Sequence, residues 1–381
     1  MNKQIIPLKG ADRIRKRPAV VFDSADADGA LAVIKTLINV MVREAILGYC
    51  TKLSVVLHKD NSISVCSNDR GIKLDETVVN EKPEWQNVFC DFGPVPPAPG
   101  EVTYDVLGKK QDTLYGDGNE FPDYSNHADY KFDLCCVQYV CEYMTVNSVR
   151  DGIRKTVEFQ KGSPVSNVRQ EPSDEQSGTV IQFKIDAEVF SSIEISVSAL
   201  ARYLQILAIT VKGLACDLCV ENEKHSFSYQ YENGIGDYVG THNCYIKEKE
   251  AVGKDRYNKP EYKARVKAAI YFDENAPRCE CFHNYRELNG GTHLEAVKSK
   301  IMNYVNWFLN RNGTKFEAAE KITNNLMENL VVIIESNCSQ NSTVWTSGAR
   351  NAIANIMITD MASDLIDEDF LSFLKTVKMP V

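Results

Sequence analysis

The sequence predicts an α+β protein of two domains, with helices on one face of a mixed or antiparallel sheet. A chain of 381 residues is long for a single hydrophobic core. Apolar residues recur at helical spacing from Gly29 to Gly48, and the segments that follow alternate as strands do. The pattern of elements changes after Glu221, so we expect one domain over residues 1–221 and a second over 222–381.

In the first domain, Gly48 is placed to end the first helix, and "KDN" makes the turn of a hairpin between Lys52–His58 and Ser62–Ser67. Residues 83–126 are rich in Pro, Gly, Asp and Tyr, which predicts a long irregular loop. The pattern then predicts a helix, a strand–turn–strand unit, a strand and a second helix, at Phe132–Met144, Met144–Gly162, Gly178–Asp186 and from about Ser196.

The second domain begins with strands near Phe227–Tyr231, Tyr262–Phe272 and Arg278–Phe282. A helix, an amphipathic helix, an apolar strand and a last helix follow, at Gly291–Gly313, Phe316–Asn325, Asn329–Ser336 and from about Gly348. His293 is expected to open the first of these helices and to serve structure.

Composition restricts the class of protein. Hydrophobic residues make up 44% and charged residues 25%, the proportions of a soluble globular protein. No apolar run reaches the roughly 18 residues needed to span a bilayer, and the N-terminus lacks the core of a signal peptide. We therefore expect a cytoplasmic protein with no membrane partner, whose twelve scattered cysteines are reduced thiols.

The net charge of −9 argues against a protein coated in nucleic acid but leaves room for a local basic face. The only sizeable basic cluster runs from Tyr245 to Ala268, with eight Lys and Arg residues against four acids. Within it, the candidates for facing DNA are Lys263, Arg265 and Lys267. A solvated hairpin is the alternative interpretation.

Several segments, in this order, resemble one family. They are Leu8–Phe22 ("LKGADRIRKRPAVVF"), the helix ending in "REAILG", the hairpin ending in "NDRGI", the strand "GTVIQF" and Cys281–Val297 ("CFHNYRELNGGTHLEAV"). Together they resemble the ATPase-plus-transducer region of the B subunits of DNA gyrase and topoisomerase IV, over essentially the whole chain. The resemblance implies a GHKL (Bergerat-type) α/β sandwich followed by a ribosomal S5-like transducer domain, as in type IIA DNA topoisomerases.

In that family one helix supplies the Glu that activates water and, four residues on, the Asn that ligates Mg²⁺. Counting back from "EAILG", Thr36 stands at the Glu position and Val40 at the Asn position. A threonine hydroxyl is a poor base near neutral pH, and a valine cannot ligate a metal. Asn39 lies next to Val40, but one helical residue turns its direction by roughly 100°. We therefore expect no catalytic residue, no metal ligand and no cofactor.

The contacts to adenine and phosphate are altered as well. The family's Asp-x-Gly-x-Gly, whose Asp accepts a hydrogen bond from the adenine amino group, has Ser67 at the Asp position and Asp69 at the first glycine. The glycine-rich lid becomes His127–Asp133, where β-carbons block the close approach of a triphosphate and two acids repel it. The transducer loop "NSTVWTSGAR" lacks the family's lysine, and Arg350 is its nearest cation.

A rim around the family's adenine and inhibitor-binding positions remains. Its residues are Ser67, Arg70, Gly71, Ile72, Arg150 and Thr179. They could bind a planar heterocycle, or they could persist because the fold needs them.

Cysteines and a histidine suggest a rival zinc site. The residues are Cys216, Cys219, Cys279, Cys281 and His283, although cysteines in apolar runs are more often buried packing. A Cys–His catalytic pair has no supporting pattern.

Three functions are weighed. The first is a non-hydrolysing pseudo-ATPase that acts by dimerisation or partner binding in DNA topology, as a homodimer or as a heterodimer with a topoisomerase subunit, and with DNA as a further candidate partner. The second is a divergent but active ATPase subunit of a type II topoisomerase, which would need ATP, Mg²⁺ and a substitute carboxylate such as Glu44. The third is a structural or ligand-sensing protein that uses the old adenine rim.

Overall fold

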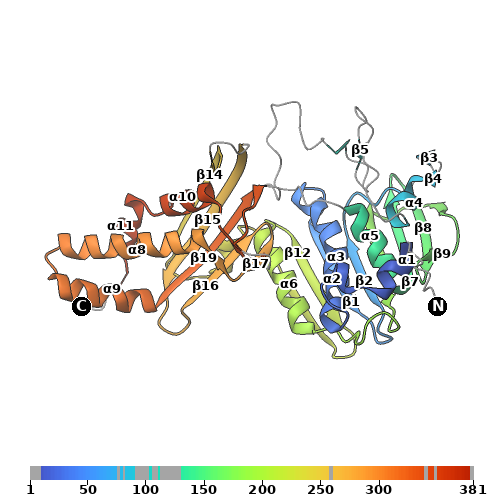
Figure 1. Ribbon diagram of the computed structural model, residues 1–381, viewed down its shortest axis with the longest axis horizontal. Coiled ribbons are helices and arrows are strands. Elements are labelled where there is room, and N and C mark those ends of the chain that lie inside the picture. The colour runs from blue at the N-terminus through green and yellow to red at the C-terminus, as the bar shows by residue number, and fades with distance from the viewer. Residues whose placement is uncertain are drawn as a thin grey trace, which may run out of the picture. The chain divides into compact units, whose positions relative to one another are not determined.

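The structure, a computed structural model, describes residues 10–74, 78–79, 82–90, 103–104, 110–111, 130–256, 261–338, 342–346 and 350–377. The chain divides into two units, of which the first ends at Gln230 and the second begins at Tyr231. Each unit has its own sheet, with helices packed against it (Figure 1). Among the described helices, none is both long enough and apolar enough to cross a membrane.

In the described part of the first unit, nine strands form one sheet. Its spatial order is β10 (Arg169–Pro172), β8 (Ile153–Gln160), β7 (Cys141–Arg150), β11 (Gly178–Ile185), β2 (Ile63–Ser67), β1 (Lys52–Leu57), β12 (Ala215–Val220) and β13 (His225–Tyr229), with β9 (Ser163–Pro164) beside β8. β1 and β12 run parallel, and the other neighbours run antiparallel. Two short hairpins join β3 (Val78–Val79) to β4 (Lys82–Pro83) and β5 (Thr103–Tyr104) to β6 (Lys110–Gln111).

The helices of the first unit are α1 (Gly10–Lys16), α2 (Ala19–Phe22), α3 (Ala27–Ile46), α4 (Glu84–Phe89), α5 (Tyr130–Tyr139) and α6 (Val197–Thr210). Figure 1 shows α3, α5 and α6 over one face of the sheet, and α3 contacts both of the others. The Asp26 side chain caps α3 by accepting a hydrogen bond from the Asp28 backbone N–H at 3.0 Å. Gly48 follows the helix end with a φ of +81°, a conformation that favours glycine.

An arginine in the "RKRP" run ties α1 to the rest of the first unit. Arg15 Nη2 donates to Asp186 Oδ2 at 2.6 Å, and its Nη1 donates to the Tyr139 carbonyl oxygen at 3.1 Å. The Arg15 guanidinium and a backbone N–H at Glu188 hold the pKa of the Asp186 carboxyl below its usual value, although burial opposes them. This part of the motif therefore serves the fold.

The second unit has a five-stranded sheet in the order β14 (Tyr245–Gly253), β15 (Tyr262–Phe272), β19 (Leu330–Cys338), β16 (Arg278–His283) and β17 (Arg286–Leu288). A small parallel pair joins β18 (Gly290–Gly291) to β20 (Ala352–Ile353). Its helices are α7 (Ile235–Tyr238), α8 (Thr292–Arg311), α9 (Phe316–Glu328), α10 (Ile356–Asp364) and α11 (Glu368–Leu374). α8 begins at the residue before His293, as expected, and its buried stripe joins the core of this unit.

Three expectations about elements are wrong, and in two of them strand pairing overrides local pattern. The helix expected at Phe132–Met144 ends at Tyr139, because the chain from Cys141 on pairs with β8 and β11. The helix expected from Gly348 starts at Ile356, because Ala352–Ile353 pairs with Gly290–Gly291. Within the loop expected over 83–126, Glu84–Phe89 is a helix.

The boundary between the units also differs from the expected one. The strand expected near Phe227–Tyr231 as the start of the second domain is β13, His225–Tyr229, which pairs with β12 in the first sheet. The first unit therefore extends past Glu221 to Gln230.

Candidate functional site

Helix α3 carries the two positions at which the resembled family places its water-activating Glu and its Mg²⁺-binding Asn. Thr36 is half-buried, and Val40, one turn later, is 2% exposed in the core. Their polar neighbour Asn39 is engaged elsewhere, because its Oδ1 accepts a hydrogen bond from the Tyr203 hydroxyl at 2.6 Å. On this face Thr36 and Val40 provide neither a carboxylate nor an amide oxygen.

Glu44, one carboxylate that an active enzyme could recruit in place of the family's Glu, is fully buried and bound to Arg70. Arg70 Nε donates to Glu44 Oε2 and Arg70 Nη2 donates to Oε1, each at 2.6 Å. The Arg70 guanidinium also lies 3.8 Å from the centre of the Tyr49 ring. A carboxylate with both oxygens held by one arginine and 0% exposure has no oxygen free to orient water.

The Asp69 carboxyl lies beside Ser67, the residue at the family's adenine-binding position. Its Oδ2 accepts a hydrogen bond from Ser67 Oγ at 2.7 Å, so its carboxyl lies beside the side chain at the family's Asp position. Its Oδ1 accepts from the Gly71 N–H and from Thr179 Oγ1, both at 2.8 Å. Burial raises the pKa of the Asp69 carboxyl, although these three donors oppose the rise. In the Asp-x-Gly-x-Gly motif, Asp69 counts only as a replaced glycine. The sequence signal that could have identified it as a site residue is its spacing of two residues from Ser67.

The rim residues form one hydrogen-bonded unit around Gly71. The Ile72 N–H donates to Thr179 Oγ1 at 3.2 Å, and Arg150 Nη1 donates to the Gly71 carbonyl oxygen at 3.3 Å. Gly71 has a φ of +79°, and a β-carbon there would lie 2.5 Å from the Val149 carbonyl oxygen. A glycine is therefore required at this position whether or not a ligand binds.

Two surface depressions divide the predicted rim. One of about 250 Å³ is lined by Ile72 and Arg150 together with Lys73, Leu74, Ser148, Asp151, Ile153 and Lys155. The other, of about 440 Å³, includes Ser67 and Thr179 in its lining. The structure thus joins the rim residues through hydrogen bonds but does not bring all of them to one cavity.

Parts of the predicted lid and transducer loop lie outside the described residues. Residues 127–129 lie outside the described residues, as do 339–341 and 347–349 of the loop that ends at Arg350. Residues 130–133 of the lid form the start of α5. The expectation that this lid excludes a triphosphate stays a prediction.

The two cysteines that the rival zinc hypothesis takes from β12 do not point to the same side. Cys216 and Cys219 lie three residues apart on β12, so they face opposite sides of the sheet, and Cys219 is exposed while Cys216 is buried. His283 is buried, which lowers its pKa to about 3, and its Nδ1 lies 2.9 Å from Ser336 Oγ. Within the described residues, no group of three His, Cys, Asp or Glu side chains is arranged to hold a metal ion.

His293 serves the packing at the start of α8. Its ring is fully buried, which lowers its pKa to about 4. A β-carbon at Gly291 would lie 2.6 Å from His293 Nδ1, so the glycine leaves space for the ring. Among the residues that the structure describes, neither ring nitrogen has a hydrogen-bond partner, and we have no physical account of that.

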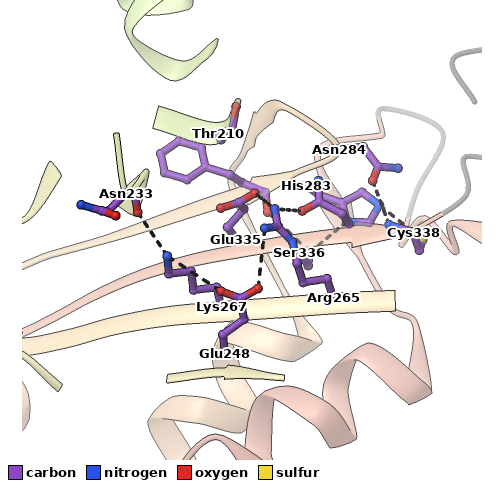
Figure 2. Close-up of polar contacts among 12 residues, drawn as sticks. Thr210, Asn233, Glu248, Arg265, Lys267, His283, Asn284, Glu335, Ser336 and Cys338 are labelled. Carbon is purple, nitrogen blue, oxygen red and sulfur yellow. Dashed lines mark hydrogen bonds and ion pairs between the residues drawn. The ribbon is translucent and has the colours of Figure 1, made fainter. Parts of the chain in front are cut away.

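Each basic residue of β15 that was predicted to face DNA lies near an acid, and Figure 2 shows this for Arg265 and Lys267. Lys263 pairs with Glu250 across the hairpin. Arg265 Nη2 lies 2.6 Å from Glu335 Oε1, and Lys267 Nζ lies 3.9 Å from Glu248 Oε2. Burial raises the pKa of Glu335 to about 7, although Arg265 and Lys267 oppose the rise. The prediction that this strip contacts DNA is not tested by these pairs, but its positive charge is largely cancelled.

Comparisons with known proteins agree with the resemblance. A family model described as DNA gyrase B matches residues 231–379, which lie in the second unit. The B subunit of DNA gyrase from Haloferax volcanii is 28% identical over 81% of this chain and 46% of its own length. The B subunit of DNA topoisomerase 4 from Bacillus subtilis is 27% identical over 77% of this chain and 42% of its own length. The chain thus spans about half the length of the curated relatives it matches.

Solved structures show the same fold. The 43K ATPase domain of Thermus thermophilus gyrase B, solved in complex with an aminocoumarin, has a TM-score of 0.68 at 20% identity, covering 97% of this chain and 91% of that one. The B-subunit of DNA gyrase from Myxococcus xanthus has a TM-score of 0.67 at 17% identity, covering 97% of both chains. The expected α/β sandwich followed by a second sheet domain is confirmed.

Proposed function

We propose that this chain, a homologue of the ATPase module of type IIA topoisomerase B subunits, does not hydrolyse ATP and acts by binding partners in DNA topology or its regulation. The proposal is carried by one observation, the commitment of Glu44 to Arg70 on a helix whose other family positions are Thr36 and Val40. Hydrolysis at such a site needs a carboxylate that can orient and deprotonate water.

No other carboxylate of α3 can take that part. The helix has two, Asp28 in its first turn and Glu44 near its end. Asp28 lies eight residues before Thr36, about 12 Å along the helix axis. Thr36 stands where the family has its catalytic Glu, and the nearest remaining acid, Glu44, is buried and paired with Arg70. This supports a loss of hydrolysis, and not a transfer of the catalytic role to another acid of α3.

Partner binding would then carry the function. The relatives are named as subunits of DNA gyrase and topoisomerase 4, which supports a role within an assembly. We propose a homodimer, or a heterodimer with a topoisomerase subunit, as the working form, with DNA as a further candidate partner. The match of the gyrase B family model to residues 231–379 favours the second unit as the part that keeps this role.

A second candidate is the sensing of a planar heterocycle at the old adenine rim. Asp69 favours it, because its carboxyl lies 2.7 Å from Ser67 Oγ and is held by Gly71 and Thr179. A heterocycle with an N–H donor could then be recognised without phosphates and without Mg²⁺. This candidate is compatible with the loss of hydrolysis.

Calorimetry and a phosphate-release assay test these proposals on the full chain. We expect no Mg²⁺-dependent ATP turnover and no Mg²⁺-dependent binding of a non-hydrolysable ATP analogue. Micromolar, Mg²⁺-dependent binding with turnover that Thr36→Ala abolishes would show an active enzyme instead. Adenosine binding that is weakened by Asp69→Asn, while Asp12→Asn on the exposed side of α1 leaves it unchanged, would support the sensing role.

A further inference from the structure

We propose that one exposed face of α8 binds single-stranded nucleic acid. The α8 face consists of Lys300, Tyr304, Trp307 and Arg311. These residues follow one another at steps of four, three and four, so their side chains lie on the same side of the helix. The face extends about 16 Å along the helix axis. This inference does not depend on what the nucleotide site of the first unit does.

The positive charge of the α8 face is not cancelled. From Ala296 to Phe316 the chain has four Lys and Arg residues and no acid. This segment is therefore positive, although the net charge of the whole chain is −9. Of these four, Lys298 is paired with Glu295 at 3.3 Å. Lys300 and Arg311 make no ion pair within the part of the chain that the structure describes. Glu295 lies five residues before Lys300, which places it about 140° away around the helix.

Each of the two cations lies over an aromatic ring of the same face. Lys300 Nζ is 5.4 Å from the centre of the Tyr304 ring, and Arg311 Cζ is 5.0 Å from the centre of the Trp307 ring. A ring holds a cation in position but carries no net negative charge that could neutralise it. The ammonium and guanidinium groups therefore stay available to phosphates, at positions already fixed by the rings.

The aromatic rings decide which polyanion fits. Trp307 is 47% exposed, whereas Trp85 of the first unit is 1% exposed. Tyr304 packs partly against the core of the second unit, which holds its ring in place. Bases of a single strand can stack on such rings while phosphates pair with the cations. A duplex keeps its bases stacked inside and presents mainly phosphates, and an acidic peptide has no bases, so neither would use the rings.

Binding of a fluorescent oligo(dT) to the full chain, followed by anisotropy at low salt, tests the proposal. We expect Trp307→Ala to weaken binding by about tenfold, through the loss of one stacked base, and Trp307→Phe to restore most of it. We expect Lys300→Gln with Arg311→Gln to lower the slope of log affinity against log salt by about 1.4. Lys161→Gln, which removes a cation of the first unit that is paired with Glu188, is the matched control and should change neither quantity.

Quenching of Trp307 fluorescence by the oligonucleotide supplies an independent signal, because stacking requires direct contact with the indole. Tighter binding of a duplex than of oligo(dT), equal competition by poly-glutamate, or an equal loss in Lys161→Gln would each overturn the proposal. The absence of any oligo(dT) binding at low salt would overturn it as well.

Discussion

Two regions of the second unit carry cations, which pair with carboxylates in one region and lie over aromatic rings in the other. On β15, Arg265 lies 2.6 Å from Glu335 of the neighbouring strand. On α8, Arg311 lies over the ring of Trp307. From the sequence alone, the β15 region is the stronger candidate for binding DNA, because it has more cations per residue. The comparison shows that the density of cations in a sequence does not measure the charge of a surface, because antiparallel strands place acids directly opposite.

The same distinction applies to the first unit. Arg70 resembles Arg265, since each arginine is bound to a carboxylate that is almost completely buried. Arginines of this kind hold the fold together, and their loss leaves a buried charge without a partner. Arginines of the α8 kind should be dispensable for stability. Substitutions at the two kinds of site can therefore test the comparison.

The largest effect is expected at Arg70. Arg70→Met leaves Glu44 fully buried without its two hydrogen bonds, so we expect the free energy of unfolding of the first unit to fall by about 3–5 kcal/mol. Urea unfolding followed by circular dichroism measures this change. The double variant Arg70→Met with Glu44→Leu should regain part of the loss. A fall below about 1 kcal/mol would mean that Glu44 is not held in this way.

Arg265 should give a smaller loss of the same kind. Arg265→Met leaves Glu335 without its nearest cation, but Lys267 also acts on the Glu335 carboxyl and remains in place. We expect the free energy of unfolding of the second unit to fall by about 2–3 kcal/mol. Lys263→Met, at an exposed pair on the same strand, should change it by less than about 1 kcal/mol. Equal effects of the two variants would contradict the buried role of Arg265.

Ionisation of Glu335 should make the free energy of unfolding of the second unit depend on pH. Burial raises its folded-state pKa to about 7 from the ordinary value of 4.5, so between these values the folded protein binds more protons than the unfolded chain. Its contribution therefore lowers the stability of the second unit as pH rises from about 4.5 to about 7, and is constant above that range. Glu335→Gln should remove this decline in urea midpoints measured from pH 5 to pH 8. A decline that persists in the variant would assign it to another group.

The smallest effect on stability is expected on the α8 face. Lys300→Gln and Arg311→Gln remove no buried contact, so we expect the free energy of unfolding to stay within about 0.5 kcal/mol of the unsubstituted chain. The same urea experiment measures this. A loss comparable to that of Arg265→Met would erase the difference between the two regions.

Much of the fold could be predicted because its signals are local. The strand at Tyr262–Phe272 agrees with β15 to the residue, and α9 begins at Phe316 as expected. The errors lie where a distant strand decides, as when Cys141–Met144 joins the sheet although its pattern resembles a helix. Local periodicity cannot report a hydrogen-bonding partner that lies far away in the chain.

The candidate site also has features that the sequence could predict and features that only the structure shows. The family resemblance puts Thr36 and Val40 at the family's Glu and Asn positions, and the structure places both residues on α3. The role of Asp69 was not readable, because its carboxyl meets Thr179, 110 residues later in the chain. A motif comparison registers Asp69 only as a missing glycine.

The sequence by itself determined which residue types occupy each helix face and strand, since spacing along the chain fixes direction within an element. Only the tertiary structure decided which charges are cancelled, because the partners are distant. Glu44 and Arg70 are 26 residues apart, and Arg265 and Glu335 are 70 apart. The charges of Lys300 and Arg311 are not cancelled, because folding brings no carboxylate to them in the part of the chain that the structure describes.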